Sequence, residues 1–353
     1  MSMVDLPNST RRGPSRRQAL KLIAASASLP IGVAGFRMFG PQPTFHEWHG
    51  EALGAEASMS LWHSNAGHAQ RTLARMVSEV GRLENIFSLY RADSELSRLN
   101  RDGFLPTASR DMISVLETSR AMAQASGGAF DPSVQPLWTL YQSHFAQGDA
   151  DPLGPSRAAI AAARQLVDYQ SISIARQSIR FAAPGMAVTL NGIAQGYITD
   201  VVSDILRNEG FDHVVVELGE TRVLGTHPDN RPWRVGLRDA AGGTARSIDL
   251  VNQSSASSGG YGTVFDPTGE HHHIFDPDTG RSAHRLAEVV IVAPCATDAD
   301  ALSTALFVAG EDKAAGILTT VPGATALLTR VDGTTAVFGP AGKVLDGVDP
   351  KMT

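Results

Sequence analysis

Two segments in the C-terminal part of the chain carry the residue types with the clearest chemical potential. His271 to Gly280 reads HHHIFDPDTG, and ATDADALSTALFVAG follows from Ala296. Asp300 and Thr304 are four positions apart, so a helix would project both oxygens from one face near its N-terminus. Hard oxygen donors at a helix start, beside a His-Ile-Phe-Asp-Pro turn, are typical of a magnesium-assisted phosphate site. The pattern therefore indicates chemistry on a nucleotide.

Three adjacent histidines, residues 271–273, offer a second kind of metal site. Neighbouring residues on an extended segment point to alternate sides, so at most two of the three could face one ion. The single cysteine, Cys295, supplies no thiolate partner, which disfavours zinc. We therefore favour a structural histidine or a general base over a zinc ligand. For Asp300 and Thr304 considered alone, a helix N-cap or a solvated face remains an equal alternative.

The segment NGIAQG, residues 191–196, is expected at a junction between a strand and a helix. Gly192 and Gly196 have no side chain, so the backbone there can approach a ligand closely, and amides at a helix start suit a phosphate. Considered alone, the two glycines are more often turn or packing residues. The segment SSGGY, residues 257–261, is predicted to be a flexible polar loop before the histidines.

Hydrophobic spacing predicts the elements that must position these residues. Between Gly67 and Leu89 the apolar residues follow the three-four spacing of a helix. Further helices are predicted from Ser109 to Ser126, from near Ser156 to before Val167, and from about Ile193 to Gly210. A strand pair is expected over 45–63. The other predicted strands are Ser171–Ile174, Ser178–Phe181, Ala187–Leu190, His213–Leu218, Arg222–Leu224, Trp233–Leu237, Arg246–Leu250, Glu288–Ala293, Ala324–Leu328 and Thr335–Phe338.

This mixture of helices and short, closely connected strands predicts an α+β fold with mostly antiparallel sheets and packed helices. We expect one catalytic domain over residues 45–350, preceded by an N-terminal region over residues 1–40. The 353 residues are 42% hydrophobic and 19% charged, which is enough for a sizeable core. The net charge of −6 argues against a nucleic-acid binder. One cysteine excludes an intramolecular disulfide.

The N-terminus resembles a twin-arginine export signal. The sequence SRRQALK, residues 15–21, precedes a mildly apolar stretch over residues 20–35 that is too short and too weak for a comfortable membrane span. The alternative is a basic tail without a targeting role. Because such signals export folded proteins, we expect a periplasmic protein. Whether the signal is cleaved or remains as a membrane anchor is left open, since no clear cleavage pattern follows.

Five segments in a fixed order resemble the ApbE family, the FAD:protein FMN transferases. They are SLYRADSELSRLN (residues 88–100), GGAFDPSVQPLW (127–138), LNGIAQGYITD (190–200) and the two segments at 271–280 and 296–310. The resemblance implies a T-fold-like architecture and a magnesium-dependent enzyme that uses FAD as substrate. Such an enzyme transfers FMN to a threonine or serine hydroxyl of a partner protein and releases AMP.

The resemblance also assigns roles to individual residues. Asp300 and Thr304 match side-chain metal ligands, and the carbonyl of Ala194 or Gly192 matches a backbone ligand. His273 matches the histidine implicated in catalysis. The residues expected to bind the cofactor are Tyr90, Phe130, Asp131, Gln195, Ser258 and Gly259.

Two segments depart from the family pattern. Residues 189–196 read TLNGIAQG where the family has Asp-Leu-Gly-Gly-Ile-Ala-Lys-Gly, and residues 218–221 read LGET where it has Gly-Gly-Asp/Asn. With the export signal, these variations look similar to the NosX branch, which serves nitrous-oxide reduction. The acceptor expected for this branch is a NosR-like membrane flavoprotein. We expect this chain to contact the membrane only through its signal region or through that partner. The alternatives are an FAD pyrophosphatase that yields FMN and AMP, or a non-catalytic flavin carrier.

Overall fold

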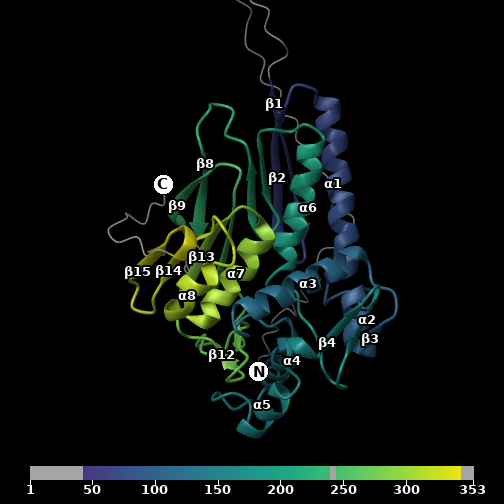
Figure 1. Cartoon of the computed structure of the whole chain (residues 1–353), viewed down its shortest axis with the longest axis vertical. Coiled ribbons are helices and arrows are strands. Elements are labelled where there is room, and N and C mark those ends of the chain that lie inside the picture. Colours follow the sequence, from purple (N-terminus) through teal and green to yellow (C-terminus); the bar gives the residue numbers. More distant parts are fainter. Residues whose placement is uncertain (1–42, 239–243, 343–353) are drawn as a thin grey trace, which may run out of the picture. The chain divides into compact units, whose positions relative to one another are not determined.

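The computed structural model describes residues 43–238 and 244–342. Within these residues, an antiparallel eight-stranded sheet, here called the main sheet, forms the centre of the fold (Figure 1). Each strand in the order below pairs with the next one along. The strands are β1 (Thr44–Ala52), β2 (Ala55–His63), β6 (Val214–Glu217), β7 (Thr221–Leu224), β10 (Ser254–Gly259), β13 (Glu288–Ala293), β14 (Thr325–Thr329) and β15 (Thr335–Phe338).

Three smaller sheets accompany the main sheet in the described part of the chain. They are the hairpin of β8 (Trp233–Arg238) and β9 (Thr244–Leu250), the sheet of β3 (Phe104–Leu105), β5 (Ser178–Phe181) and β4 (Ile172–Ala175), and the short pair of β11 (Phe275–Asp276) and β12 (Arg281–Ser282). All of their pairings are antiparallel as well.

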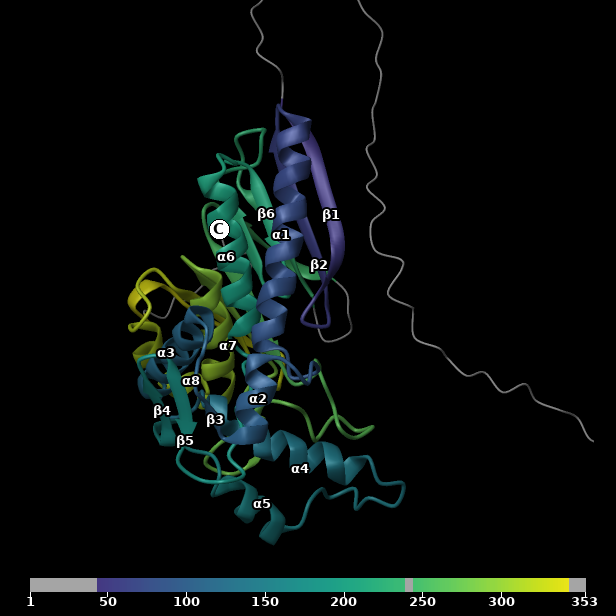
Figure 2. The same ribbon diagram turned by 90° about the vertical axis from the view of Figure 1, so that its right-hand side faces the viewer.

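The α-helices of the described residues lie mostly in the first half of the chain, and a run of strands from β6 to β13 separates α6 from α7 (Figures 1 and 2). Helices α1, α6 and α7 pack against one face of the main sheet and against one another. The helices are α1 (Ala66–Phe87), α2 (Glu95–Asp102), α3 (Arg110–Ala125), α4 (Gln135–Phe145), α5 (Arg157–Arg164), α6 (Ala194–Asn208), α7 (Ala296–Ala309) and α8 (Glu311–Leu318).

Strand β13 shows how the core is divided. Its sequence EVVIVA is buried on both faces. Val289 and Ile291 join the large apolar cluster under the helices, whereas Val292 packs with Trp233 of the β8–β9 hairpin. Since successive side chains of a strand point to opposite faces, the helices and the hairpin must cover opposite sides of the main sheet. A strand buried on both sides is accordingly a continuous apolar run.

Helices α6 and α7 are joined by one carboxylate. Asp200, on α6, accepts hydrogen bonds from the backbone N–H groups of Ala296 and Thr297 at 2.8 Å each, and so caps the N-terminus of α7. The buried guanidinium of Arg222, on β7, lies 2.6 Å from the same carboxylate. A side chain at position 196 would place its Cβ only 2.3 Å from the carbonyl oxygen of Ala296. Gly196 therefore lets the two helices touch.

Most of the elements predicted from the sequence are confirmed. The helix predicted over residues 67–89 is α1, and the apolar residues that defined it are largely its buried face. Ser109 and Ser156, where two helices were predicted to start, are the N-caps of α3 and α5. They accept hydrogen bonds from the N–H groups of Met112 and Ala159. The expected α+β class with antiparallel sheets and packed helices is likewise confirmed.

Two local predictions are wrong. Residues 187–190 form no strand, because the N–H and C=O of Val188 bond to the side-chain amide of Asn100 instead of to a neighbouring strand. Consequently, NGIAQG does not follow a strand. The predicted polar loop over 257–261 begins inside strand β10, which runs to Gly259. Its serines suggested a loop, but most of β10 is buried.

The predicted export-signal region, residues 1–40, and residues 343–350 of the predicted domain lie outside the described residues. The domain boundaries therefore stay predictions. Among the described residues, no helix has the length and hydrophobicity needed to cross a membrane.

Replacing Asp200 with asparagine should destabilise the fold by about 3 kcal/mol or more, because the buried charge of Arg222 would lose its partner. The measurement is the free energy of unfolding in urea. Asp204→Asn is the matched control: it lies on the same helix and forms an exposed ion pair with Arg207, so its loss should cost less than about 1 kcal/mol. Equal effects of the two substitutions would contradict the proposed role of Asp200.

Candidate active site

Asp300 lies in the second turn of α7 and is only 4% exposed. The backbone N–H of Gly196, in the first turn of α6, donates a hydrogen bond of 3.0 Å to its Oδ2. A side chain at 196 would come within 2.8 Å of the Cβ of Asp300 as well. The close approach of the two helices therefore holds this carboxylate in one position.

Carboxyl groups lie close together around Asp300, and the pKa values of Asp300 and Glu220 are raised. Burial raises the pKa of Asp300, and the nearby Asp200 raises it further. Burial, and then the proximity of Asp300, also raise the pKa of Glu220 well above its usual range, against the effect of a hydrogen bond from the N–H of Ser257. Among the described residues, no Lys or Arg contributes to either shift. Buried carboxylates in proteins are paired with cations or bind metal ions, so this arrangement fits a bound cation.

Thr304 lies one helical turn after Asp300 and contributes a hydroxyl oxygen. A Cβ at Gly192 would lie 2.9 Å from its Oγ1, so the segment before α6 lies directly against it. In a regular helix the carbonyl of Gly192 would accept from the N–H of Gly196, but that N–H donates to Asp300. Ala194 is the first residue of α6, where its carbonyl takes part in helical bonding. Of the two candidate backbone ligands, we therefore favour Gly192.

The resulting donors are a carboxylate, a hydroxyl and a backbone carbonyl. All are hard oxygens, as Mg²⁺ prefers, and a set this small leaves coordination positions for water and phosphate oxygens. Among the described residues, no cluster of three or more His, Cys, Asp or Glu side chains could hold a metal ion. The donors near Asp300 and Thr304 thus fit magnesium better than a transition metal.

Two of the amides at the start of α6 already have partners within the protein. The N–H of Ala194 donates to the carbonyl of Leu190 at 2.8 Å, and that of Gly196 donates to Asp300. The packing interpretation of Gly196 is the one that the structure supports.

His273 lies in the segment before β11, and its ring contacts the backbone of Thr263. Its Nδ1 is 3.2 Å from the N–H and 3.1 Å from the carbonyl oxygen of Thr263. Gly262 packs closely beside the ring, where a Cβ would lie 3.0 Å from Cε1. Burial lowers the pKa of His273. The imidazole is therefore neutral at neutral pH, the form that a general base requires.

The other two histidines of the cluster are structural. His272 Nε2 donates to the carbonyl of Ala283 at 2.9 Å, and its Nδ1 accepts from the N–H of Ile274 at 3.3 Å. His271 packs between aromatic rings, with centroids 5.0 Å from Phe145 and 5.7 Å from Tyr141. The preference for structural histidines over a zinc site agrees with these contacts.

The predicted cofactor residues fall into different settings. Phe130 is buried, and a Cβ at Gly192 would lie 3.4 Å from its ring, so it belongs beside the candidate metal donors. Asp131 accepts from the N–H and hydroxyl of Ser133 and from the N–H of Tyr169, which anchors its own loop. Tyr90 is 77% exposed. Their contacts with a flavin stay predictions.

Three other predicted residues are Gln195, whose side chain reaches from α6 to the turn between β6 and β7, and Ser258 and Gly259 at the end of β10. The side chain of Gln195 packs against Gly219, where a Cβ would come within 2.4 Å of its Nε2. Ser258 is buried, and its Oγ lies 3.3 Å from Oγ1 of Thr304. The ring of Tyr261 covers Gly259. The two segments that depart from the family pattern, at Gln195 and at Gly219, are thus in contact.

Reasoning from the sequence missed several residues that position the site. Asp200 ends the motif LNGIAQGYITD, which was a usable signal, but its partner Arg222 is distant in the sequence. Ser303 is adjacent to Thr304, yet a serine inside a helix gives no distinctive pattern. Glu220 was recognised only as a departure from the family, because its burial beside Asp300 depends on the fold.

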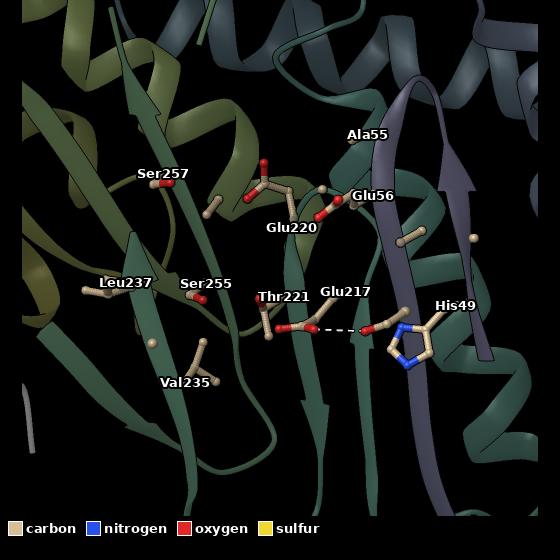
Figure 3. Close-up of a pocket in the computed structure, with 16 residues that line it drawn as sticks. His49, Ala55, Glu56, Glu217, Glu220, Thr221, Val235, Leu237, Ser255 and Ser257 are labelled. Atoms are coloured by element: carbon tan, nitrogen blue, oxygen red, sulfur yellow. Dashed lines mark hydrogen bonds between the residues drawn. The ribbon is translucent and has the colours of Figure 1, made fainter. Parts of the chain in front are cut away.

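A pocket of about 830 Å³ lies between the main sheet and the β8–β9 hairpin (Figure 3). Its described lining includes Glu56, Glu217 and Glu220 but no Lys or Arg. Ser58 donates a hydrogen bond of 2.9 Å to Glu217, drawn as the dashed line in Figure 3. The pocket approaches the candidate site through Glu220.

The fold and the site define an α+β protein in which two packed helices present oxygen donors, and a histidine on a separate segment is held against the backbone of Thr263. Residues 53–328 match the model of the ApbE family. A FAD:protein FMN transferase of Treponema pallidum (strain Nichols) is 32% identical over 287 residues, which cover 76% of this chain and 79% of that protein. This chain belongs to the ApbE family.

Solved structures agree with the family assignment. The apo form of the flavinyl transferase ApbE of Pseudomonas stutzeri has a TM-score of 0.70 and 28% identity, and the alignment covers 85% of this chain and 97% of that structure. The flavin transferase ApbE of Vibrio cholerae has a TM-score of 0.71 at 24% identity, covering 85% and 98% respectively, and supports the fold alone.

The buried His272 should make stability depend on pH. Burial lowers its pKa to about 4, below the ordinary value of about 6.5, so the unfolded chain binds the proton more readily. The stabilising effect is complete above about pH 6.5 and is lost as the pH falls toward about 4, by on the order of 3 kcal/mol. In urea unfolding, the advantage of the wild type over His272→Gln should shrink by this amount between pH 7 and pH 4.

The same substitution at the exposed His49 provides the baseline for this measurement. A difference between wild type and His272→Gln that does not change with pH would contradict the assignment of a buried, neutral His272.

Proposed function

We propose that this chain is a FAD:protein FMN transferase, which moves FMN from FAD to a threonine or serine hydroxyl of a partner protein and releases AMP. The observation that carries the proposal is the pair of Asp300 and Thr304 on one side of α7, with Gly192 packed against Thr304 and the Asp300 carboxyl group buried. Membership of a family whose relatives bear this name supports it.

Asp300, Thr304 and the carbonyl of Gly192 or Ala194 would hold Mg²⁺ in this enzyme. When bound, the ion would neutralise negative charge on the pyrophosphate and orient it. The hydrogen bond from Gly196 fixes Asp300 in advance, so the site requires little reorganisation when substrate arrives.

His273 would accept the proton of the attacking hydroxyl. Its lowered pKa keeps the imidazole neutral at neutral pH, so a lone pair is available for that proton. The hydroxyl oxygen then forms a bond to the phosphorus on the FMN side. The bond from that phosphorus to the bridging oxygen breaks, and AMP leaves with the bridging oxygen.

We further propose that the enzyme acts in the periplasm, after twin-arginine export, on a NosR-like membrane flavoprotein of a nitrous-oxide reduction system. The SRRQALK segment supports export. The NosX-like variations support the branch. Gln195, in one varied segment, packs against Gly219, which lies between Leu218 and Glu220 of the other.

Transfer can be measured by incubating the full chain with FAD, Mg²⁺ and an acceptor domain that carries the target threonine. We expect a covalent FMN adduct in the mass spectrum, none when the acceptor threonine is alanine, and a loss on the order of a hundredfold in rate for Asp300→Asn. Asp298→Asn is the matched control, since it lies on the same helix and contacts Cys295 instead. His273→Ala should also slow transfer.

The other outcomes are equally informative. AMP and free FMN without an adduct would identify a pyrophosphatase with water as nucleophile, and neither product would identify a flavin carrier. Either result would reject the proposed transferase. Unchanged turnover in Asp300→Asn would reject the metal assignment.

Export can be tested by fractionating bacteria that express the full chain. Changing Arg16 and Arg17 together to lysine should remove the protein from the periplasm. The same change at the neighbouring pair Arg11 and Arg12 is the control and should leave export intact. Equal periplasmic amounts for both variants would reject the signal.

A further inference from the structure

Three hydroxyl groups meet between strand β10 and helix α7. The Oγ atoms of Ser258 and Ser303 are 2.7 Å apart, and Oγ of Ser258 is 3.3 Å from Oγ1 of Thr304. Both serines are almost completely buried, at 8% and 1% exposure. Buried hydroxyls in contact must arrange their hydrogens in a consistent order, because each has only one to donate.

The order is set at Ser303. Its hydroxyl lies 2.8 Å from the backbone carbonyl of Asp300, which can only accept, so Ser303 donates there. Having no second hydrogen, Ser303 must accept from Ser258. Since Ser258 uses its one hydrogen in this bond, its oxygen must accept the hydrogen of the Thr304 hydroxyl. The hydrogens therefore run in one direction, from Thr304 through Ser258 and Ser303 to the Asp300 carbonyl.

This order has a consequence for Thr304. A threonine within a helix commonly donates its hydroxyl back to the carbonyl four residues earlier, which for Thr304 is that of Asp300. That carbonyl already receives the hydroxyl of Ser303, in addition to the helical N–H. The hydrogen of Thr304 is instead directed to Ser258, and the lone pairs of Oγ1 are left for other partners.

We propose that Ser258 and Ser303 are positioning residues that orient the Thr304 hydroxyl, with its hydrogen toward Ser258 and its lone pairs toward a bound divalent cation. The inference rests on the proposed function, in which Thr304 is a ligand. In this inference, Ser258 holds the metal ligand Thr304 in its orientation, and Ser303 fixes the direction of the hydrogen bonds.

The test is the affinity of the full-length protein for Mg²⁺, measured by titration calorimetry without FAD. Ser258→Ala and Ser303→Ala should each weaken binding about tenfold, the effect of one lost hydrogen bond. Ser258→Thr keeps the hydroxyl and should restore affinity. Ser257→Ala is the matched control, because this neighbour on β10 is exposed and faces away from α7. Thermal unfolding without Mg²⁺ checks that each variant is folded.

A double-mutant cycle separates positioning from general structure. In a Thr304→Val background, Ser258→Ala should cause no further loss of Mg²⁺ affinity, because the hydroxyl on which it acts is gone. Wild-type affinity in both serine variants, or a full further loss in the Thr304→Val background, would overturn the inference. If the wild type or Asp300→Asn shows that Mg²⁺ does not bind at this site, the metal assignment and the inference both fail. The transfer assay with FAD and the acceptor domain tests the proposed function separately, so failure of the inference can be told apart from failure of that function.

Discussion

The carboxylate of Asp200 is the interaction on which the rest of the site depends. It caps α7 through two backbone N–H groups and is itself neutralised by the buried Arg222 of β7. One side chain thereby links two helices and a strand of the main sheet. The cap also determines where α7 begins, and hence which face of that helix presents Asp300 and Thr304. A shift of α7 by one residue would rotate both oxygens away from α6.

The contact between α6 and α7 depends on Gly196 in two ways. Without a side chain, Gly196 lets the backbone of α6 meet that of α7, and its N–H then reaches the carboxylate of Asp300. Because this first-turn N–H donates to Asp300, it does not bond the carbonyl of Gly192, a residue that precedes α6 and packs against Thr304. Close packing, a fixed carboxylate and a candidate backbone ligand thus share one physical cause. Burial raises the pKa of Asp300 and Glu220, and a bound cation would stabilise their charged forms.

Elements marked by hydrophobic periodicity could be predicted from the sequence, whereas elements that depend on hydrogen bonds to distant residues could not. Helix α1 was predictable because its apolar stripe has the period of a helix and is buried along its length. Strand β10 was not predictable, because a run of serines is typical of a loop. In the fold, Arg222 hydrogen-bonds to Ser254 and Ser303 to Ser258, so these serine hydroxyls can be buried. Residues 187–190 alternate like a strand, but the side chain of Asn100 occupies the backbone groups that a partner strand would need.

The sequence by itself determined the family, the residue types of the candidate site and most of the helices and strands, because motifs and periodicity are local properties of the chain. It also placed Asp300 and Thr304 on one helical face. Only the tertiary structure decided which groups surround them: the cap from Asp200, the contact with Gly192, the buried Glu220 and the directed hydroxyls of Ser258 and Ser303. These contacts join residues that are far apart in the sequence, so they exist only once the main sheet and its helices have packed.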